Sequence, residues 1–104
     1  MHREKFFDAI KRRKKIRLTF FSKEDNRNLT RVCAPMDFGP SRRAKSQDDR
    51  YHSWDYESDE GRHTLSLPIA QVIMIEVLEE SFDPVEFVTW TPNWIYPRDW
   101  GSHS

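Results

Sequence analysis

The stretch Arg50–Leu67, RYHSWDYESDEGRHTLSL, carries the strongest structural signal in this chain of 104 residues. Ser58-Asp59-Glu60-Gly61 is rich in turn-forming residues, and apolar and polar side chains alternate on both sides of it. If these four residues form the turn, Trp54 lies opposite Leu65 and Glu57 lies opposite Arg62. The pattern therefore predicts a β-hairpin.

The predicted hairpin has one apolar face and one polar face, because side chains alternate along a strand. The apolar face holds His52, Trp54, Tyr56, His63, Leu65 and Leu67. The polar face holds Ser53, Asp55, Glu57, Arg62, Thr64 and Ser66. Since an isolated hairpin is marginally stable in water, we expect further strands beneath the apolar face.

The remaining chain supplies a helix and more strands. Apolar residues recur at helical spacing from Arg3 to Lys14, and period-2 alternation predicts strands over residues 15–21 (KIRLTFF) and 29–35 (LTRVCAP). Residues 39–50 contain no aliphatic side chain larger than alanine and are predicted to form a loop. Residues 71–78 (QVIMIEVL) are apolar on both alternating faces, which predicts a central strand covered on both sides.

The last twenty residues differ in character from the rest. They hold Trp90, Trp94, Tyr96 and Trp100 among two prolines, without helical or strand periodicity. We therefore divide the chain into a helix-plus-sheet domain over residues 1–84 and an extended aromatic arm over residues 85–104. The arm either lies over the domain and completes its core or contacts a second copy of the chain.

Composition limits the class of protein. The length fits one domain, the single Cys33 excludes an internal disulfide, and no apolar run is long enough to span a membrane, so we expect a cytoplasmic protein without membrane contact. The 17 basic and 17 acidic residues cancel. Their distribution is uneven, with 15 basic against 7 acidic residues in 1–50 and 2 against 10 in 51–104, which favours a dipolar surface unless folding interleaves the two halves.

The sequence gives no motif for a metal, a cofactor or catalysis. Cys33, His52 and His63 lack the close spacing of known metal motifs, and Cys33 fits a small buried core residue. Asp55 and Glu57 share a face, but acid–base catalysis also requires a cleft that removes water from one of them. We expect no enzyme, no cofactor and no metal.

A basic run, Lys11 to Lys15 plus Arg17, follows the predicted helix. Such cations satisfy the last helix carbonyls or remain in water. The alternative is a patch that contacts phosphate, extended by Arg31, Arg42, Arg43 and Lys45.

The order of elements resembles the WYL domain of bacterial transcription regulators over roughly Lys5 to Pro84. The matching segments are FFDAIKRRKKIRLTFF, the Arg-x-x-x-Pro of TRVCAP, and IAQVIMIEVLEESFDP. Tyr51-His52-Ser53 stands where the family carries its Trp-Tyr-Leu tripeptide. Members of the family usually carry a helix-turn-helix before this domain. Only a few residues precede the predicted helix here, so we expect a free-standing module.

The resemblance implies an α+β fold that is mainly β, an SH3-like (Sm-like) barrel of about five strands with an N-terminal helix. It also implies a ligand-sensing site on the barrel for an anion such as a nucleotide or single-stranded nucleic acid. The residues that match this site are Arg31, Tyr51, His52 and Arg62, with the arginines binding phosphate and the rings stacking on a base.

Two functions follow from these patterns. The first is a non-enzymatic ligand-sensing or regulatory module that binds a nucleotide or single-stranded nucleic acid. The second is a protein-interaction or self-assembly module, in which the arm from Trp90 to Trp100 makes a homodimer, because Trp and Tyr are enriched at interface centres.

Overall fold

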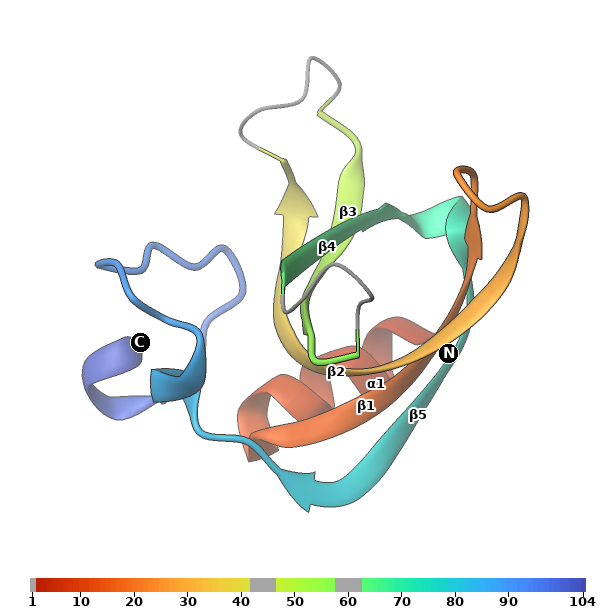
Figure 1. The fold of residues 1–104 in the computed structure, drawn as a ribbon. Helices are drawn as coiled ribbons and strands as arrows, with labels where there is room; N and C mark the ends of the chain where they lie inside the picture. Colours follow the sequence, from red (N-terminus) through yellow and green to blue (C-terminus); the bar gives the residue numbers. More distant parts are fainter. Residues whose placement is uncertain (1, 42–46, 58–62) are drawn as a thin grey trace.

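The fold is α+β, with one N-terminal helix and a five-stranded antiparallel sheet in the order β4-β3-β2-β1-β5 (Figure 1). The structure is a computed structural model that describes residues 2–41, 47–57 and 63–104. Its main elements are α1 (His2–Arg12), β1 (Lys14–Ser22), β2 (Arg27–Pro40), β3 (Asp49–Asp55), β4 (His63–Pro68) and β5 (Val72–Ser81). Short 3-10 helices cover Ile69–Gln71, Pro84–Glu86 and Gly101–His103. No helix in the described part of the chain is long and apolar enough to cross a membrane.

The N-terminal helix and the first strand form where the sequence predicts them. Phe6, Ala9 and Ile10 are fully buried on one face of α1, and its two ends carry charges of the sign that the helix dipole favours. Arg13 ends the helix in a left-handed conformation, with φ of 54°. The chain therefore reverses within one residue and enters β1 directly.

The strand β2 is longer than predicted and joins the two halves of the sheet. Residues 27–33 pair with β1, and residues 33–40 pair with β3. Pro35 therefore lies inside the strand and not at its end, next to a register shift that leaves Met36 as an extra residue. Residues 39, 40, 49 and 50 of the predicted loop are also in strands, and residues 42–46 lie outside the described residues. This long, bulged strand lets the sheet curl around the core (Figure 1).

The sheet does not close into the predicted barrel. Its order places β4 and β5 at opposite edges, with no ladder between them among the described residues. The prediction of β5 as a central strand is also wrong, because β5 pairs only with β1. Its side chains confirm the edge position, since Ile73 and Met74 are 44% and 53% exposed. The apolar run on both faces did not indicate a central strand, because one face of this edge strand is exposed to solvent and is not packed against a second layer.

The hairpin exists, but its register differs by one residue from the prediction. Trp54 lies opposite Thr64, and Asp55 lies opposite His63. A slip of one residue moves side chains to the other face of the partner strand, so Leu65 and Leu67 share a face with Tyr51 and Ser53. In β3 the buried side chains are Tyr51, Ser53 and Asp55, and His52 and Trp54 of the predicted apolar set lie on the opposite, outer face. The predicted turn, residues 58–61, lies outside the described residues.

The C-terminal segment packs into the same core as the sheet and the helix. Phe87, Val88 and Trp100 are almost fully buried, in one cluster with Phe6 and Ile10 of the helix. The indole N–H of Trp100 donates a hydrogen bond of 2.8 Å to the carbonyl of Ile10 near the end of α1. Of the two arrangements that the sequence leaves open for the aromatic arm, the described chain adopts the first.

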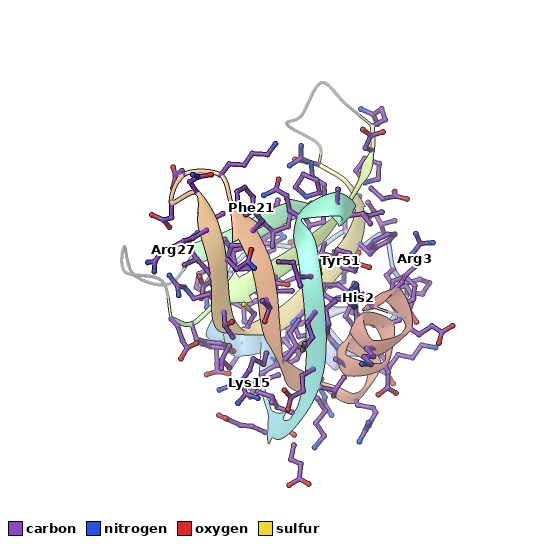
Figure 2. All side chains as sticks on the ribbon, turned by 90° about the vertical axis from the view of Figure 1, so that its right-hand side faces the viewer. His2, Arg3, Lys15, Phe21, Arg27 and Tyr51 are labelled. Atoms are coloured by element: carbon purple, nitrogen blue, oxygen red, sulfur yellow. The ribbon has the colours of Figure 1, made fainter. Side chains whose placement is uncertain are left out.

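Pairing of β1 with β5 brings the basic and acidic halves of the sequence together. Lys15 and Glu80 form an ion pair of 2.6 Å, and Arg17 and Glu76 one of 2.9 Å. Figure 2 shows β1 between β2 and β5, with Lys15 and Phe21 at opposite ends of the strand. Folding therefore cancels much of the basic run locally. Such exposed pairs contribute only about 0–1 kcal/mol each to stability.

Candidate ligand groove

Of the four residues expected to bind a ligand, the three that the structure describes do not converge on one site. Tyr51 is 3% exposed and makes edge-to-face contacts with Phe6 and Phe38, at centroid distances of 4.9 and 5.0 Å. Burial raises the pKa of its hydroxyl, and Arg3 partly offsets this shift. Figure 2 shows Tyr51 beside the start of α1. His52, the next residue, points to the opposite face, and Arg62 lies outside the described residues.

Arg31 is directed to a buried carboxylate. Its Nε lies 3.7 Å from Oδ2 of Asp55, whose side chain is 2% exposed. The backbone N–H of Glu57 donates a hydrogen bond of 2.8 Å to the other oxygen of Asp55. The sequence predicts Asp55 and Glu57 side by side on a solvated face, but the register places Asp55 inside. Because a buried carboxylate is costly without a partner, the contact of Arg31 with Asp55 is structural.

Cys33 lies in the same interior region. Burial, the largest cause, and the nearby carboxylates of Asp55 and Glu57 raise the pKa of its thiol. The reactive form of cysteine is the thiolate, so this thiol is poorly suited to nucleophilic chemistry.

A groove of about 540 Å³ lies on the other, outer face of the β3–β4 hairpin. The strands contribute His52, Thr64 and Ser66 to its lining, and the C-terminal segment contributes Trp90, Asn93 and Ile95. Asp37, His52 and Ser66 stand opposite one another across β2, β3 and β4 and form a polar row along its floor. The groove is therefore built by two segments that are distant in sequence.

Asp37 fixes the C-terminal wall of this groove. Its two carboxylate oxygens accept hydrogen bonds of 2.9 Å from the backbone N–H groups of Ile95 and Tyr96. Gly39, two residues further along β2, allows a close approach, since a Cβ there would lie 2.6 Å from Cδ1 of Ile95. The φ of Gly39 is 153°, which also favours glycine.

Arg98 completes the attachment of the C-terminal segment. Its guanidinium lies 4.3 and 4.4 Å from the ring centroids of Trp94 and Trp100. It donates hydrogen bonds to the carbonyl of Met36, at the bulge of β2, and to that of Tyr96, and its Nη2 lies 3.4 Å from Oδ1 of Asp37. Burial lowers the pKa of Arg98 to about 10, against the opposing effect of Asp37, so the cation persists at neutral pH.

Neither Asp37 nor Arg98 is among the site residues predicted from the sequence. Arg98 is one of only two basic residues after residue 50, and it stands between two tryptophans. That isolated cation among aromatic rings was the available signal, because a guanidinium stacks well on indole faces.

Both ring nitrogens of His52 are hydrogen-bonded. Its Nε2 lies 2.9 Å from the carbonyl oxygen of Gly39, and its Nδ1 lies 2.8 Å from Oγ of Ser66. On the predicted register His52 and His63 share a face, but the observed register puts His63 on the face of Asp55. No group of three or more His, Cys, Asp or Glu within the described ranges is arranged to hold a metal ion.

The groove offers a ring surface beside hydrogen-bonding groups. Trp90 is 47% exposed and makes an edge-to-face contact of 6.0 Å with Trp94, which supports it from one side. Asp37 is the one charged residue of the described lining, and the C-terminal segment already uses its carboxylate. The site is therefore suited to a flat, polar ring.

No family model, curated protein or solved structure matches this chain.

Proposed function

We propose that this chain is a non-enzymatic ligand-sensing or regulatory module that binds a nucleotide or single-stranded nucleic acid, with a base in the groove between β3–β4 and residues 90–95. The observation that supports the proposal is the exposed ring of Trp90 beside the polar row that ends in His52 and Ser66. Stacking of a base on an aromatic side chain contributes about 1–3 kcal/mol.

Phosphate binding requires cations near the groove. Arg50 lies on β3 two residues before His52, so both point to the outer face, and its Nη1 is 3.3 Å from the carbonyl of Ser66. Arg42 and Arg43 follow the lining residue Ser41 in sequence and lie outside the described residues, as does Arg62. Because Arg31 is paired with Asp55, we assign the phosphate to Arg50 and test the others by substitution.

The resemblance to the WYL domain supports the same role. A helix followed by strands in this order, with a long bent β2 shared by both halves of the sheet, fits a divergent SH3-like domain whose edges stay open. We propose that the chain is a divergent relative of that family.

Titration of the full chain tests the proposal. Adenosine monophosphate and a short oligothymidine are added at several salt concentrations while tryptophan fluorescence is followed. We expect binding at low salt that weakens as salt rises, as phosphate contacts require. Trp90→Ala should weaken binding of both ligands about 5- to 100-fold, the equivalent of one stacked base.

Arg50→Ala and Arg42→Ala/Arg43→Ala separate the possible phosphate contacts. Removal of an arginine that binds phosphate should reduce the dependence of the affinity on salt concentration. Lys23→Ala, in the exposed β1–β2 turn, should leave this dependence unchanged. Absence of binding at low salt, or binding that is insensitive to Trp90→Ala, would end this proposal.

Self-assembly is the second candidate, and a specific surface favours it. Ile73 and Met74 are exposed on the edge strand β5, and Ile69 next to it is 42% exposed. The C-terminal tryptophans are less available than the sequence suggests, since Trp94 and Trp100 pack within their own chain. Light scattering of the full chain and of Ile73→Thr/Met74→Lys distinguishes the cases. A monomer in both would exclude this interface.

A further inference from the structure

A chain of hydrogen bonds runs across the floor of the groove from Gly39 through His52 to Ser66. The carbonyl oxygen of Gly39 accepts only, so the Nε2 of His52, 2.9 Å away, must carry a proton and donate. In the neutral imidazole the other nitrogen, Nδ1, then has a lone pair and accepts. The hydroxyl of Ser66, 2.8 Å from Nδ1, is therefore the donor in that bond.

The direction of this bond decides what Ser66 offers to a ligand. While its hydroxyl proton points to His52, the Ser66 oxygen presents only lone pairs to the groove that it lines. When His52 is protonated, Nδ1 donates instead and the Ser66 oxygen accepts. The hydroxyl proton is then free to turn toward the groove. One proton on His52 thus changes Ser66 from an acceptor to a donor.

We propose that the His52–Ser66 pair sets the specificity of the groove for the base and makes it depend on pH. This inference rests on the proposed nucleotide-binding function. Neutral His52 selects a base that presents an amino group to Ser66, and protonated His52 selects a base that presents a keto oxygen. Cytosine and uracil are the matched pair, because they have the same pyrimidine ring and cytosine presents an amino group where uracil presents a keto oxygen.

Charged and hydrogen-bonding groups surround His52 on this floor. Asp37 faces it from β2, Arg50 lies beside it on β3, Ser66 and Thr64 lie on β4, and Arg98 reaches Asp37 from the C-terminal segment. Carboxylates and guanidinium groups do not ordinarily change charge between about pH 5 and 8, whereas imidazole does.

Competitive binding of cytidine and uridine monophosphate tests the inference. Their relative affinity is measured at about pH 5.5 and about pH 8, and titration of the phosphate, which is common to both, cancels from the ratio. We expect the ratio to shift toward the uridine nucleotide at the lower pH by about 3- to 30-fold, since a net hydrogen bond is gained by one ligand as it is lost by the other.

Two variants separate this role from a general effect on the fold. Ser66→Ala should make the ratio independent of pH, whereas Thr64→Ala, which removes the neighbouring hydroxyl on the same face of β4, should keep the pH dependence. A wild-type ratio that does not change with pH would overturn the inference and leave the proposed function intact. Absence of binding for both nucleotides at either pH would overturn both.

The free protein provides a test that needs no ligand. Nuclear magnetic resonance of the His52 ring nitrogens at about pH 8 should show the tautomer protonated at Nε2. Observation of the Nδ1–H tautomer would reverse the Ser66 bond and overturn the inference even if nucleotides bind.

Discussion

Replacement of Trp100 by alanine should destabilise the whole domain, although this residue lies near the C-terminus. Its ring is 2% exposed and meets Phe82, Phe87 and Trp94 edge-to-face, at centroid distances of 5.4, 6.3 and 5.4 Å. Removal of such a buried ring costs about 3–5 kcal/mol of unfolding free energy. Loss of the indole hydrogen bond to the carbonyl of Ile10 adds little to this cost, because that carbonyl also accepts a hydrogen bond of 3.3 Å from the N–H of Arg13.

Urea unfolding followed by far-UV circular dichroism measures the effect. If the slope of the unfolding free energy is about 2 kcal/mol per molar urea, a loss of about 4 kcal/mol lowers the midpoint by about 2 M. Trp90→Ala is the matched control, since its ring is 47% exposed, and it should lower the unfolding free energy by less than about 1 kcal/mol. Equal effects of the two substitutions would show that the C-terminal segment does not belong to the core.

Three further predictions follow from the interior and the groove. Arg31→Ala should cost about 1–3 kcal/mol in the same unfolding assay, because it leaves the carboxylate of Asp55 buried without its cation, and Arg31→Ala/Asp55→Asn should recover part of the loss. An equal loss in the double variant would refute the pairing. Cys33 should react with a thiol reagent at neutral pH at least about 100-fold more slowly in the native protein than in urea, since burial and the neighbouring carboxylates keep it protonated. Gly39→Ala should weaken ligand binding and destabilise the domain, because the new Cβ would meet Ile95 and the backbone φ of 153° is strained for alanine. Unchanged binding and stability would show that Ile95 does not pack against Gly39.

Local patterns predicted the first part of the chain well. The helix and β1 were placed within about two residues, because helical spacing and period-2 alternation there coincide with burial in the tertiary structure. The existence of the β3–β4 hairpin was also confirmed. These elements depend on neighbours in sequence, which a single sequence shows directly.

The faces of β3 were not predictable in the same way. The alternation of aromatic residues identified a strand and suggested that His52, Trp54 and Tyr56 face the core, but the C-terminal segment covers that outer side instead. The inner face of β3 is therefore buried and its outer face is half-buried. Among the candidate ligand residues, His52 lies in the groove for this reason, whereas Tyr51 belongs to the core and Arg31 to an internal ion pair.

The sequence by itself determined the helix, the strands and a C-terminal segment too aromatic to remain in water. Only the tertiary structure decided that the sheet stays open, that β5 is an edge, and that the last residues return to β2. The physical reason is that these features depend on contacts between distant positions, such as the carboxylate of Asp37 with the backbone of Ile95 and Tyr96. Arg98 links the same segment to the bulge of β2 through the carbonyl of Met36, and no local pattern in the sequence indicates which carbonyl it would reach. The groove is formed by that return of the chain.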